Sequence, residues 1–550
     1  MTDSTARKIL VAVAWPYASG SRHLGHIAGV YLPADIFARF HRAIGNDVLM
    51  VSGSDVHGTP ITVRADQEDV DPQIVVDRYH AEFLGYWEQL GISWDLYTST
   101  GTENHREVTW DVFRRLRDHG FITKGRSQQF YDPEASRFLP DRYVEGTCPH
   151  CGYAQARGDQ CDNCGRQLDP DDLIDPHSRL SGVTPVMRDT EHYFIRLSAL
   201  QDDLLEWLKS RNGWRRHVQN MAIGFTEEGL HDRAISRDLT WGIPLPPESD
   251  DIGEGKRIYV WFEAVIGYLS ASKEWARTSG DPEAWRAWWE DPEAESYYFI
   301  GKDNIVFHTV IWPAQLIGYR GLNLPTDVPA NQYVTFGGEK GSSSRGVGRA
   351  VSWYADRVEP DALRYALASV LPEQNDTELS DGEIVRRVND ELVATWGNLV
   401  HRVLSMTHRY LDGTIPKPGD RDAVDDAVLA EVDRTLDEMR DLMLAVRLRG
   451  GLQRAMTGAQ AVNVYLNERR PWQTATTDPE ATATTLATAL DAIGGLAVAF
   501  QPYLPFTSGK LLDHLGVVAD GWARPALEPG TRLDPPQPMF TKMDPLDEGD

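Results

Sequence analysis

All four cysteines of the chain fall between residues 148 and 164, as two C-x-x-C pairs, Cys148 with Cys151 and Cys161 with Cys164. Two such turns can bring four thiolates together with the spacing of a tetrahedral Zn²⁺ site. Because four thiolates leave no open coordination position, we predict one structural zinc ion rather than a catalytic one. Two disulfides or a redox-active C-x-x-C are the alternatives, and both are less favoured because nothing else in the sequence indicates export.

A second pattern suited to chemistry is the tetrad His23-Leu24-Gly25-His26. It lies where a predicted strand passes into a predicted helix, so helix-end N–H groups and two imidazoles can converge on a chain of phosphates. Gly25 leaves room for a flat base to approach the backbone. The alternative is a pair of histidines that only cap or pack.

Much later in the chain, residues 340–346 read Lys-Gly-Ser-Ser-Ser-Arg-Gly. A cationic segment rich in Gly and Ser is flexible and suited to closing over a triphosphate. The alternative is a linker that binds no ligand. The tetrad and this segment are more informative together than separately.

The elements around the tetrad follow the order of a parallel α/β sheet. Residues 8–14 form a predicted buried strand, an amphipathic run follows from about 24 to 44, and residues 47–52 form a second strand. Strand, helix and strand in this order indicate a Rossmann-type parallel sheet, whose ligands bind beyond the carboxyl ends of the strands. The tetrad and a polar cluster at 54–59 both lie at such ends.

A chain of 550 residues is too long for one hydrophobic core. The α/β pattern becomes irregular near residue 123 and resumes after about 246, and beyond 381 apolar residues recur at helical spacing. We predict a Rossmann-type catalytic domain split by a zinc-knuckle insertion, then an α-helical bundle and a loosely packed tail. The expected segments are 1–122, the first half of the catalytic domain; 123–245, the insertion; 246–331, the second half; 332–384, the cationic loop and a stem-contact region; 385–519, the bundle; and 520–550, the acidic, Pro-rich tail.

The net charge of −27 repels polyanions at long range, so any contact with nucleic acid needs local arginine clusters. The apolar run 9–15 is better interpreted as a first strand than as a signal peptide, because Pro16 and a polar loop follow it. The run 486–500 contains Asp491 and is shorter than the ~20 residues that span a bilayer. We expect a cytoplasmic protein without a membrane segment, and a monomer.

With a split α/β domain, a zinc insertion and a helical bundle, the tetrad and the cationic loop resemble the two signatures of class I aminoacyl-tRNA synthetases, H-I-G-H and K-M-S-K-S. Within that class, the sequence resembles the methionyl-tRNA synthetase family over almost its whole length. The blocks that carry the resemblance are Trp15-Pro-Tyr17-Ala-Ser-Gly, Asp55-Val-His57-Gly-Thr-Pro, Leu139-Pro-Asp-Arg142, Pro185-Val-Met-Arg188-Asp, Ile235-Ser-Arg237-Asp, Tyr259-Val-Trp261 and Phe299-Ile-Gly301-Lys302-Asp303. The resemblance implies a ligase that activates L-methionine with ATP and transfers it to tRNA(Met) for initiation and elongation.

The resemblance also implies a methionine site. Asp55 matches the carboxylate that holds the ammonium group, since a buried cation needs a paired charge. An aromatic lining suits the polarizable thioether, and Tyr268 and His308 are expected to offer hydrogens to the sulfur. The matching lining residues are Trp15, Tyr17, Trp261, Ala264, Tyr268, Phe307, His308 and Trp312. The family often has Leu at Trp15 and Pro at Val265, and the alternative is that these aromatic residues belong to an ordinary core.

For the ATP site, the resemblance implies Asp303 near the ribose and Lys302 near the phosphates, although an isolated Gly-Lys-Asp is commonly a turn. His23, His26 and Lys340, with Mg²⁺, are the expected catalytic groups because activation needs positioning and charge stabilisation rather than a general base. The full expected ATP site is His23, Gly25, His26, Gly301, Lys302, Asp303, Lys340 and Ser343. Two positions depart from the family loop: Ser343 replaces its second Lys and Gly341 its Met, which makes Lys340 the better candidate for a phosphate ligand.

In the bundle, the resemblance assigns anticodon reading to Asn398 and Arg402, which share a helix face, and stacking to Pro471 and Trp472. A core tryptophan beside a solvated arginine is the alternative. Three other functions compete with the reading as a whole. They are another class I synthetase, although those for Ile, Val and Leu carry a larger editing insertion; a nucleotidylyltransferase with an H-x-G-H tetrad; and a catalytically silent paralogue that only binds tRNA.

Overall fold

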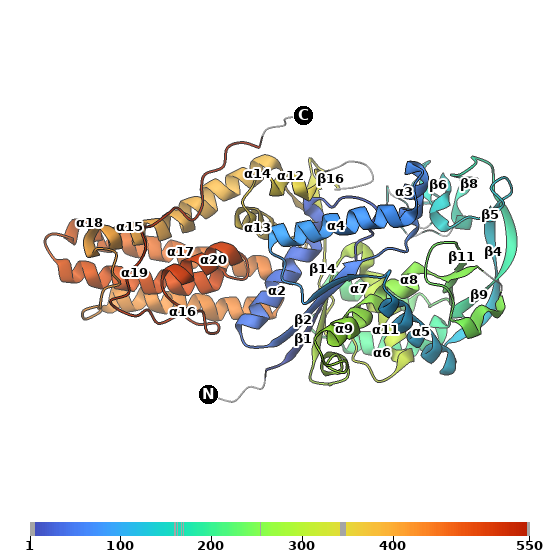
Figure 1. Ribbon diagram of the computed structural model, residues 1–550, viewed down its shortest axis with the longest axis horizontal. Coiled ribbons are helices and arrows are strands. Elements are labelled where there is room, and N and C mark those ends of the chain that lie inside the picture. The colour runs from blue at the N-terminus through green and yellow to red at the C-terminus, as the bar shows by residue number, and fades with distance from the viewer. Residues whose placement is uncertain are drawn as a thin grey trace.

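The computed structural model describes residues 6–158, 161, 163, 164, 166, 168, 170–252, 255–340 and 348–546. An α/β region and a helical bundle lie side by side along the long axis of the molecule (Figure 1). The strands of the insertion lie at the end of the molecule opposite the bundle (Figure 1). The order of these parts along the chain is the order expected from the sequence.

Five parallel strands form the central sheet, in the order β14-β13-β1-β2-β3. Their bounds are β1 Lys8–Val13, β2 Asp47–Ser54, β3 Leu96–Ser99, β13 Glu295–Gly301 and β14 Ala330–Asn331. The predicted strand at 8–14 is confirmed as β1, and its residue Ile9 pairs with Val48 of β2 on one side and Glu295 of β13 on the other. Because the strand order reverses at β1, a ligand site is expected beyond its carboxyl end.

Alternate residues of β1 enter two different hydrophobic cores, as the pleat of a strand requires. Ile9, Val11 and Val13 pack into one core, while Leu10 and Ala12 pack into the other. Helices on both faces complete the cores, which explains why the strand is apolar throughout. The helices on the first face are α2 (Leu32–Ala43) and α4 (Pro72–Leu90), and those on the second are α5 (Glu103–Asp118), α9 (Gly267–Thr278) and α11 (Trp312–Tyr319).

The insertion, expected from the sequence only as an irregular region, contains two further sheets. One has the order β10-β9-β4-β5, and the smaller one, β7-β6-β8, lies beside the cysteines. Their bounds are β4 Ile122–Asp132, β5 Arg137–Phe138, β6 Val144–Thr147, β7 Ala156–Arg157, β8 Ile174–Ser178, β9 Val186–Ile195 and β10 Arg233–Ala234. The chain returns through α6 (Gln201–Ser210), α7 (Arg216–Glu227), the pair β11 (Ser236–Asp238) and β12 (Lys256–Ile258), and α8 (Val260–Glu263).

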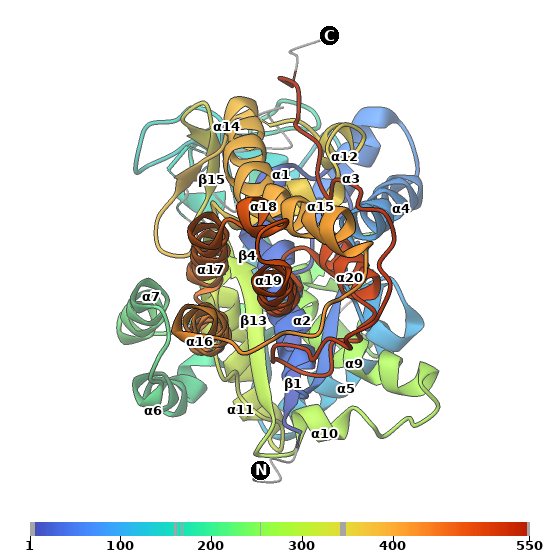
Figure 2. The same cartoon turned by 90° about the vertical axis from the view of Figure 1, so that its left-hand side faces the viewer.

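The chain beyond β14 leads into the helical bundle. A small sheet follows, with the order β16-β15-β17 and the bounds β15 Val334–Phe336, β16 Glu339–Lys340 and β17 Thr377–Glu378. Between β16 and β17 the chain forms helices α12 (Val351–Ala355) and α13 (Pro360–Ala368). The bundle consists of α14 (Asp381–Arg386), η9 (Arg387–Gly397), α15 (Asn398–Leu411), α16 (Ala423–Leu444), α17 (Leu448–Arg469), α18 (Pro471–Thr474), α19 (Pro479–Phe500) and α20 (Pro505–His514). Seen end-on, α19 lies among α15, α16, α17 and α20 (Figure 2), and it contacts all four. By length and composition α19 is apolar enough to cross a membrane, but 89% of its most apolar stretch is buried, so its character is that of the bundle's core helix.

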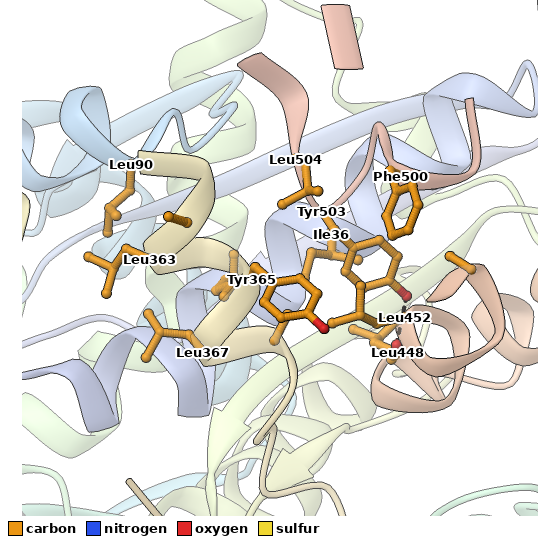
Figure 3. Packing of buried hydrophobic residues seen from close by; sticks show 14 of the residues in the cluster. Ile36, Leu90, Leu363, Tyr365, Leu367, Leu448, Leu452, Phe500, Tyr503 and Leu504 are labelled. Carbon is orange, nitrogen blue, oxygen red and sulfur yellow. Dashed lines mark hydrogen bonds between the residues drawn. The ribbon is translucent and has the colours of Figure 1, made fainter. Parts of the chain in front are cut away.

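The bundle and the α/β region share one hydrophobic core. Ile36 of α2 and Leu363 of α13 lie near Tyr503 and Leu452 of the bundle (Figure 3). The hydroxyl of Tyr503 donates to the carbonyl of Leu448 over 2.6 Å. A continuous apolar core makes the two regions one packed body rather than two joined by a linker.

The tail, expected to be loosely packed, is anchored at a few buried side chains between residues 520 and 546. Trp522, Leu533 and Phe540 are each at most 6% exposed, and the Trp522 indole N–H donates to the carbonyl of Leu436 over 2.8 Å. Near the end, the N–H of Met543 donates to Asn389 of the bundle over 2.8 Å. Isolated apolar side chains anchor an extended strap that has no periodicity, so composition alone did not indicate its burial.

Candidate active site

A cavity of about 330 Å³ opens beyond the carboxyl ends of β1, β2 and β13. Its walls come from the loop after β1, the turn after β2, α8 and its continuation, and the segment after β13. It brings together residues from Ala14 to Val334, which lie more than 300 positions apart in the chain. The sequence-derived candidates that line it are Trp15, Tyr17, His23, Gly25, His26, Asp55, Trp261, Ala264, Tyr268, Gly301, Asp303, Phe307 and His308.

His23 and His26 lie together at the start of helix α1 (Leu24–His26), with ring centroids 3.8 Å apart and ring planes tilted by 41°. Nδ1 of His23 accepts from the N–H of Gly25 at 3.1 Å, and Nδ1 of His26 accepts from the N–H of His23 at 3.3 Å. Since both Nδ1 atoms are acceptors, the neutral rings carry their protons on Nε2 and act there as donors. A Cβ at Gly25 would lie 2.9 Å from the His23 ring, so this glycine is needed for the ring to fold over the backbone.

Asp55 directly follows β2 and is 3% exposed. Its Oδ1 accepts from the backbone N–H of His57 over 3.2 Å. Burial and the nearby carboxylate of Glu263 raise the pKa of Asp55 well above its usual value. A carboxylate in this position favours a cationic ligand, because a cation offsets both causes of the shift.

Glycines leave room for two aromatic rings that line the cavity, those of Trp15 and Tyr17. A Cβ at Gly53 would come within 2.2 Å of the Trp15 indole, and one at Gly267 within 2.7 Å. A Cβ at Gly58 would likewise meet the Tyr17 ring at 2.1 Å. The bulkier Trp15, where the family often has Leu, is therefore accommodated by neighbours without side chains.

Tyr268 and His308 make a buried hydrogen bond of 2.6 Å between the hydroxyl and Nε2. Nδ1 of His308 donates to the carbonyl of Asn304 over 2.9 Å, so Nε2 is the acceptor and the tyrosine hydroxyl is the donor. Burial lowers the pKa of His308 to about 4, which keeps its ring neutral. In this arrangement both hydrogens have protein acceptors. The expected hydrogen bonds from these residues to a sulfur atom stay a prediction.

Several expected site residues lie outside the cavity lining. Trp312 is 1% exposed and its Nε1 donates to the hydroxyl of Tyr298 over 3.0 Å, behind the wall rather than on it. Nζ of Lys302 pairs with Asp376 at 2.9 Å. Lys340 ends β16, but its side chain and the whole of Ser343 lie outside the described residues.

The cavity also has lining residues that sequence reasoning missed, among them Arg22, Tyr31, Arg142, Gln332 and Tyr333. The partly buried guanidinium of Arg22 donates to the carbonyls of Tyr17 and Gly20 and so shapes the loop before the tetrad. Its position directly before His23 is the sequence feature that could have indicated a place in the cavity lining. Arg142 comes from the insertion, within a block that the resemblance had already singled out.

The four cysteine sulfur atoms lie within 4.8 Å of one another. Two of the sulfur–sulfur distances are 3.6 Å, between Cys151 and Cys161, and 4.0 Å, between Cys148 and Cys164. Sulfurs of a disulfide are about 2.05 Å apart, whereas zinc bonds of about 2.3 Å in a tetrahedron place sulfurs about 3.8 Å apart. The cluster could therefore bind a zinc ion, and its spacing disagrees with two disulfides.

Helix α18, which carries the candidate residues Pro471 and Trp472, lies at the end of the bundle that is remote from the central sheet (Figure 1). Trp472 is 41% exposed, and the guanidinium of Arg402 lies 5.7 Å from its ring centroid. Arg402 also donates to Asn467 over 3.2 Å, and Asn398 is exposed one turn earlier on the same helix. Pro471 is buried and is the first residue of α18.

A Rossmann-type sheet with a histidine tetrad at its switch point, a cysteine insertion and a helical bundle define a class I tRNA synthetase. The family model described as tRNA synthetases class I (M) matches residues 9–404, and that described as the anticodon binding domain of methionyl tRNA ligase matches residues 415–549. The chain belongs to the methionyl-tRNA synthetase family.

Individual relatives agree over nearly the full length. The chain is 49% identical to the methionine-tRNA ligase of Thermomicrobium roseum, covering 97% of this chain and 96% of the relative, and 49% identical to that of Dehalococcoides mccartyi strain BAV1, covering 98% of each. The crystal structure of Mycobacterium tuberculosis methionyl-tRNA synthetase bound by methionyl-adenylate superposes with a TM-score of 0.80 at 28% identity, covering 98% of this chain and 100% of that one.

Proposed function

We propose that this protein is a methionine-tRNA ligase. It activates L-methionine with ATP to methionyl-adenylate, releasing diphosphate, and then transfers the methionyl group to tRNA(Met), releasing AMP. The observation that carries the proposal is one cavity that holds a buried carboxylate, an aromatic enclosure and a pair of imidazole donors.

Asp55 binds the ammonium group of methionine in this proposal. The cation restores the ionised form of Asp55, whose pKa is raised in the ligand-free protein by burial and by Glu263. Trp15, Tyr268 and Phe307 enclose the side chain, and the thioether contacts their rings at about 0.3–1.5 kcal/mol each. Trp312 supports this enclosure from behind through Tyr298.

The activation step depends on positioning. The methionine carboxylate is already ionised at pH 7, so it attacks the α-phosphate without a general base. The Nε2–H groups of His23 and His26 donate to the phosphate oxygens as charge grows on them, with Gly301 and Asp303 beside the nucleoside. Lys340 adds positive charge to the diphosphate, and bound Mg²⁺ supplies further charge neutralisation there.

Recognition of tRNA is assigned to the far end of the bundle. Trp472 stacks an unpaired anticodon base, and Arg402 and Asn398 read base edges. The cysteine cluster holds one structural zinc ion that stabilises the small sheet β7-β6-β8. We place the enzyme in the cytoplasm as a monomer.

Methionine-dependent exchange between ATP and labelled diphosphate tests the proposal with the purified chain. We expect exchange with methionine and charging of tRNA(Met) but not of a leucine tRNA. Absence of exchange with methionine, or faster exchange with leucine, would contradict it. Adenylate formation without charging would instead limit the protein to the first step.

A further inference from the structure

A carboxylate with no assigned role lies immediately behind the cavity. Glu263 ends α8 and is 0% exposed. Its Oε1 lies 3.0 Å from Nδ1 of His57, and its Oε2 lies 2.5 Å from Nε2 of His105. The three residues come from three different elements, since His57 follows β2 and His105 lies on α5.

The triad of His57, Glu263 and His105 is linked by further hydrogen bonds to two opposite walls of the cavity. On one side, the backbone N–H of His57 donates to Oδ1 of Asp55. On the other, Nδ1 of His105 lies 2.9 Å from Oγ of Ser270, two residues after Tyr268 on α9. Glu263 itself stands between two wall residues, Trp261 and Ala264.

The buried carboxylate of Glu263 depends on both of its imidazole partners. Burial raises the pKa of this carboxyl, but the two imidazoles outweigh burial and hold the pKa below its ordinary value. An ionised carboxylate without exposure depends on its hydrogen bonds, and loss of one is costly. The geometry of His57, Glu263 and His105 is therefore strongly determined.

We propose that Glu263 is a positioning residue that sets the distance between the ammonium-binding carboxylate of Asp55 and the aromatic wall that receives the substrate side chain. Through His57 it holds the turn after β2, and through His105 and Ser270 it holds α9. The distance between these two parts of the site therefore determines which side-chain length fits between them. This inference rests on the proposed methionine site.

The test compares three variants in the exchange assay. Glu263→Gln keeps the size of the side chain but provides one acceptor oxygen for two imidazoles. Ser270→Ala is the milder change, because it removes only the contact between Oγ of Ser270 and Nδ1 of His105. Glu274→Gln is the matched control, because Glu274 is a half-buried carboxylate on the same helix α9 whose oxygens accept from Thr98 at 3.0 Å, away from the cavity.

For Glu263→Gln we expect the KM for methionine to rise about tenfold while the KM for ATP changes less than about twofold, because only one substrate is misplaced. Selectivity for methionine over ethionine, which is one methylene longer, should fall. Ser270→Ala should raise the KM for methionine about threefold, and Glu274→Gln should leave both KM values within about twofold of the parent.

A Glu263→Gln protein with unchanged methionine KM and selectivity overturns the inference, as does an equal rise in both KM values. If that variant does not fold, Ser270→Ala decides, and an unchanged methionine KM there overturns the inference. The parent protein separates the two proposals. If it shows no methionine-dependent exchange, the proposed function fails; if it is active and Glu263→Gln matches it, only the positioning role fails.

Discussion

The hydroxyl of Tyr268 donates a buried 2.6 Å hydrogen bond to Nε2 of His308, inside the wall of the cavity. Tyr268→Phe should leave that nitrogen without its partner at a cost of about 1–3 kcal/mol. We expect the KM for methionine to rise about five- to tenfold in the exchange assay, since the wall is disturbed. The control is Tyr319→Phe, which removes a hydroxyl that donates to Asp111 over 2.8 Å outside the cavity and should lower stability without changing this KM. Equal effects on KM would show that the bond is not part of the site.

The buried ring of His308 should make the stability of the protein depend on pH. Burial lowers the pKa of His308 from 6.5 to about 4, so the folded state binds fewer protons than the unfolded state between these values. Its contribution is therefore complete above pH 6.5 and is lost as pH falls through about 4, a difference of about 3 kcal/mol. Melting temperatures from pH 7 to 4 should fall more steeply for the parent than for His308→Gln. Parallel curves would contradict the neutral buried ring.

The ionised carboxylate of Asp55 should lower the melting temperature of the ligand-free protein although it is required for activity. Its folded-state pKa is raised by burial and by Glu263, so its stabilising contribution is present at acid pH and is lost as pH rises through the raised value. Asp55→Asn should therefore melt at a higher temperature than the parent at pH 8 without ligand, with the difference vanishing toward pH 4. Methionine-dependent exchange should fall at least about 100-fold, because a charge-assisted contact is lost. A lower melting temperature at pH 8 would show that Asp55 is stabilising when ionised.

Removal of metal should affect the insertion selectively. The strands β6, β7 and β8 are short, and the core around them is small and includes the sulfur-bearing residues Cys148 and Cys161. Metal binding supplies folding free energy in such small units. We expect about one zinc ion per chain, and we expect chelation or Cys148→Ser to make the insertion sensitive to limited proteolysis while the bundle stays resistant. Unchanged cleavage after complete loss of zinc would contradict this role.

Local signals in the sequence were sufficient for the framework. The apolar run of β1, the helix after the tetrad and the paired cysteines are each defined by neighbouring residues, and all three predictions agree with the structure. The direction of the Tyr268 hydrogen was not predictable, because it depends on a carbonyl at Asn304 that accepts from the other side of His308. Glu263 was missed for a related reason, since its partners His57 and His105 lie 206 and 158 positions away in the sequence. Trp312 was expected on the wall because it matches a lining position of the family's methionine site, but its indole N–H donates to Tyr298.

Trp472 offers the sharpest separation of the two steps of the proposed reaction. Its ring is 41% exposed beside Arg402, and the buried Pro471 holds it at the start of α18, at the end of the bundle remote from the sheet (Figure 1). Stacking of an unpaired base on an aromatic ring contributes about 1–3 kcal/mol. Trp472→Ala should therefore lower kcat/KM for tRNA charging about 5- to 150-fold while methionine-dependent exchange stays within about twofold of the parent.

Trp472→Phe is the matched control, because a smaller ring still stacks. It should retain most of the charging activity. An exposed ring that served only local packing would lower the melting temperature in both variants and leave charging and exchange equal to the parent. If exchange and charging fall together in Trp472→Ala, the residue supports the whole fold instead, since the residues that line the cavity come from other elements than α18.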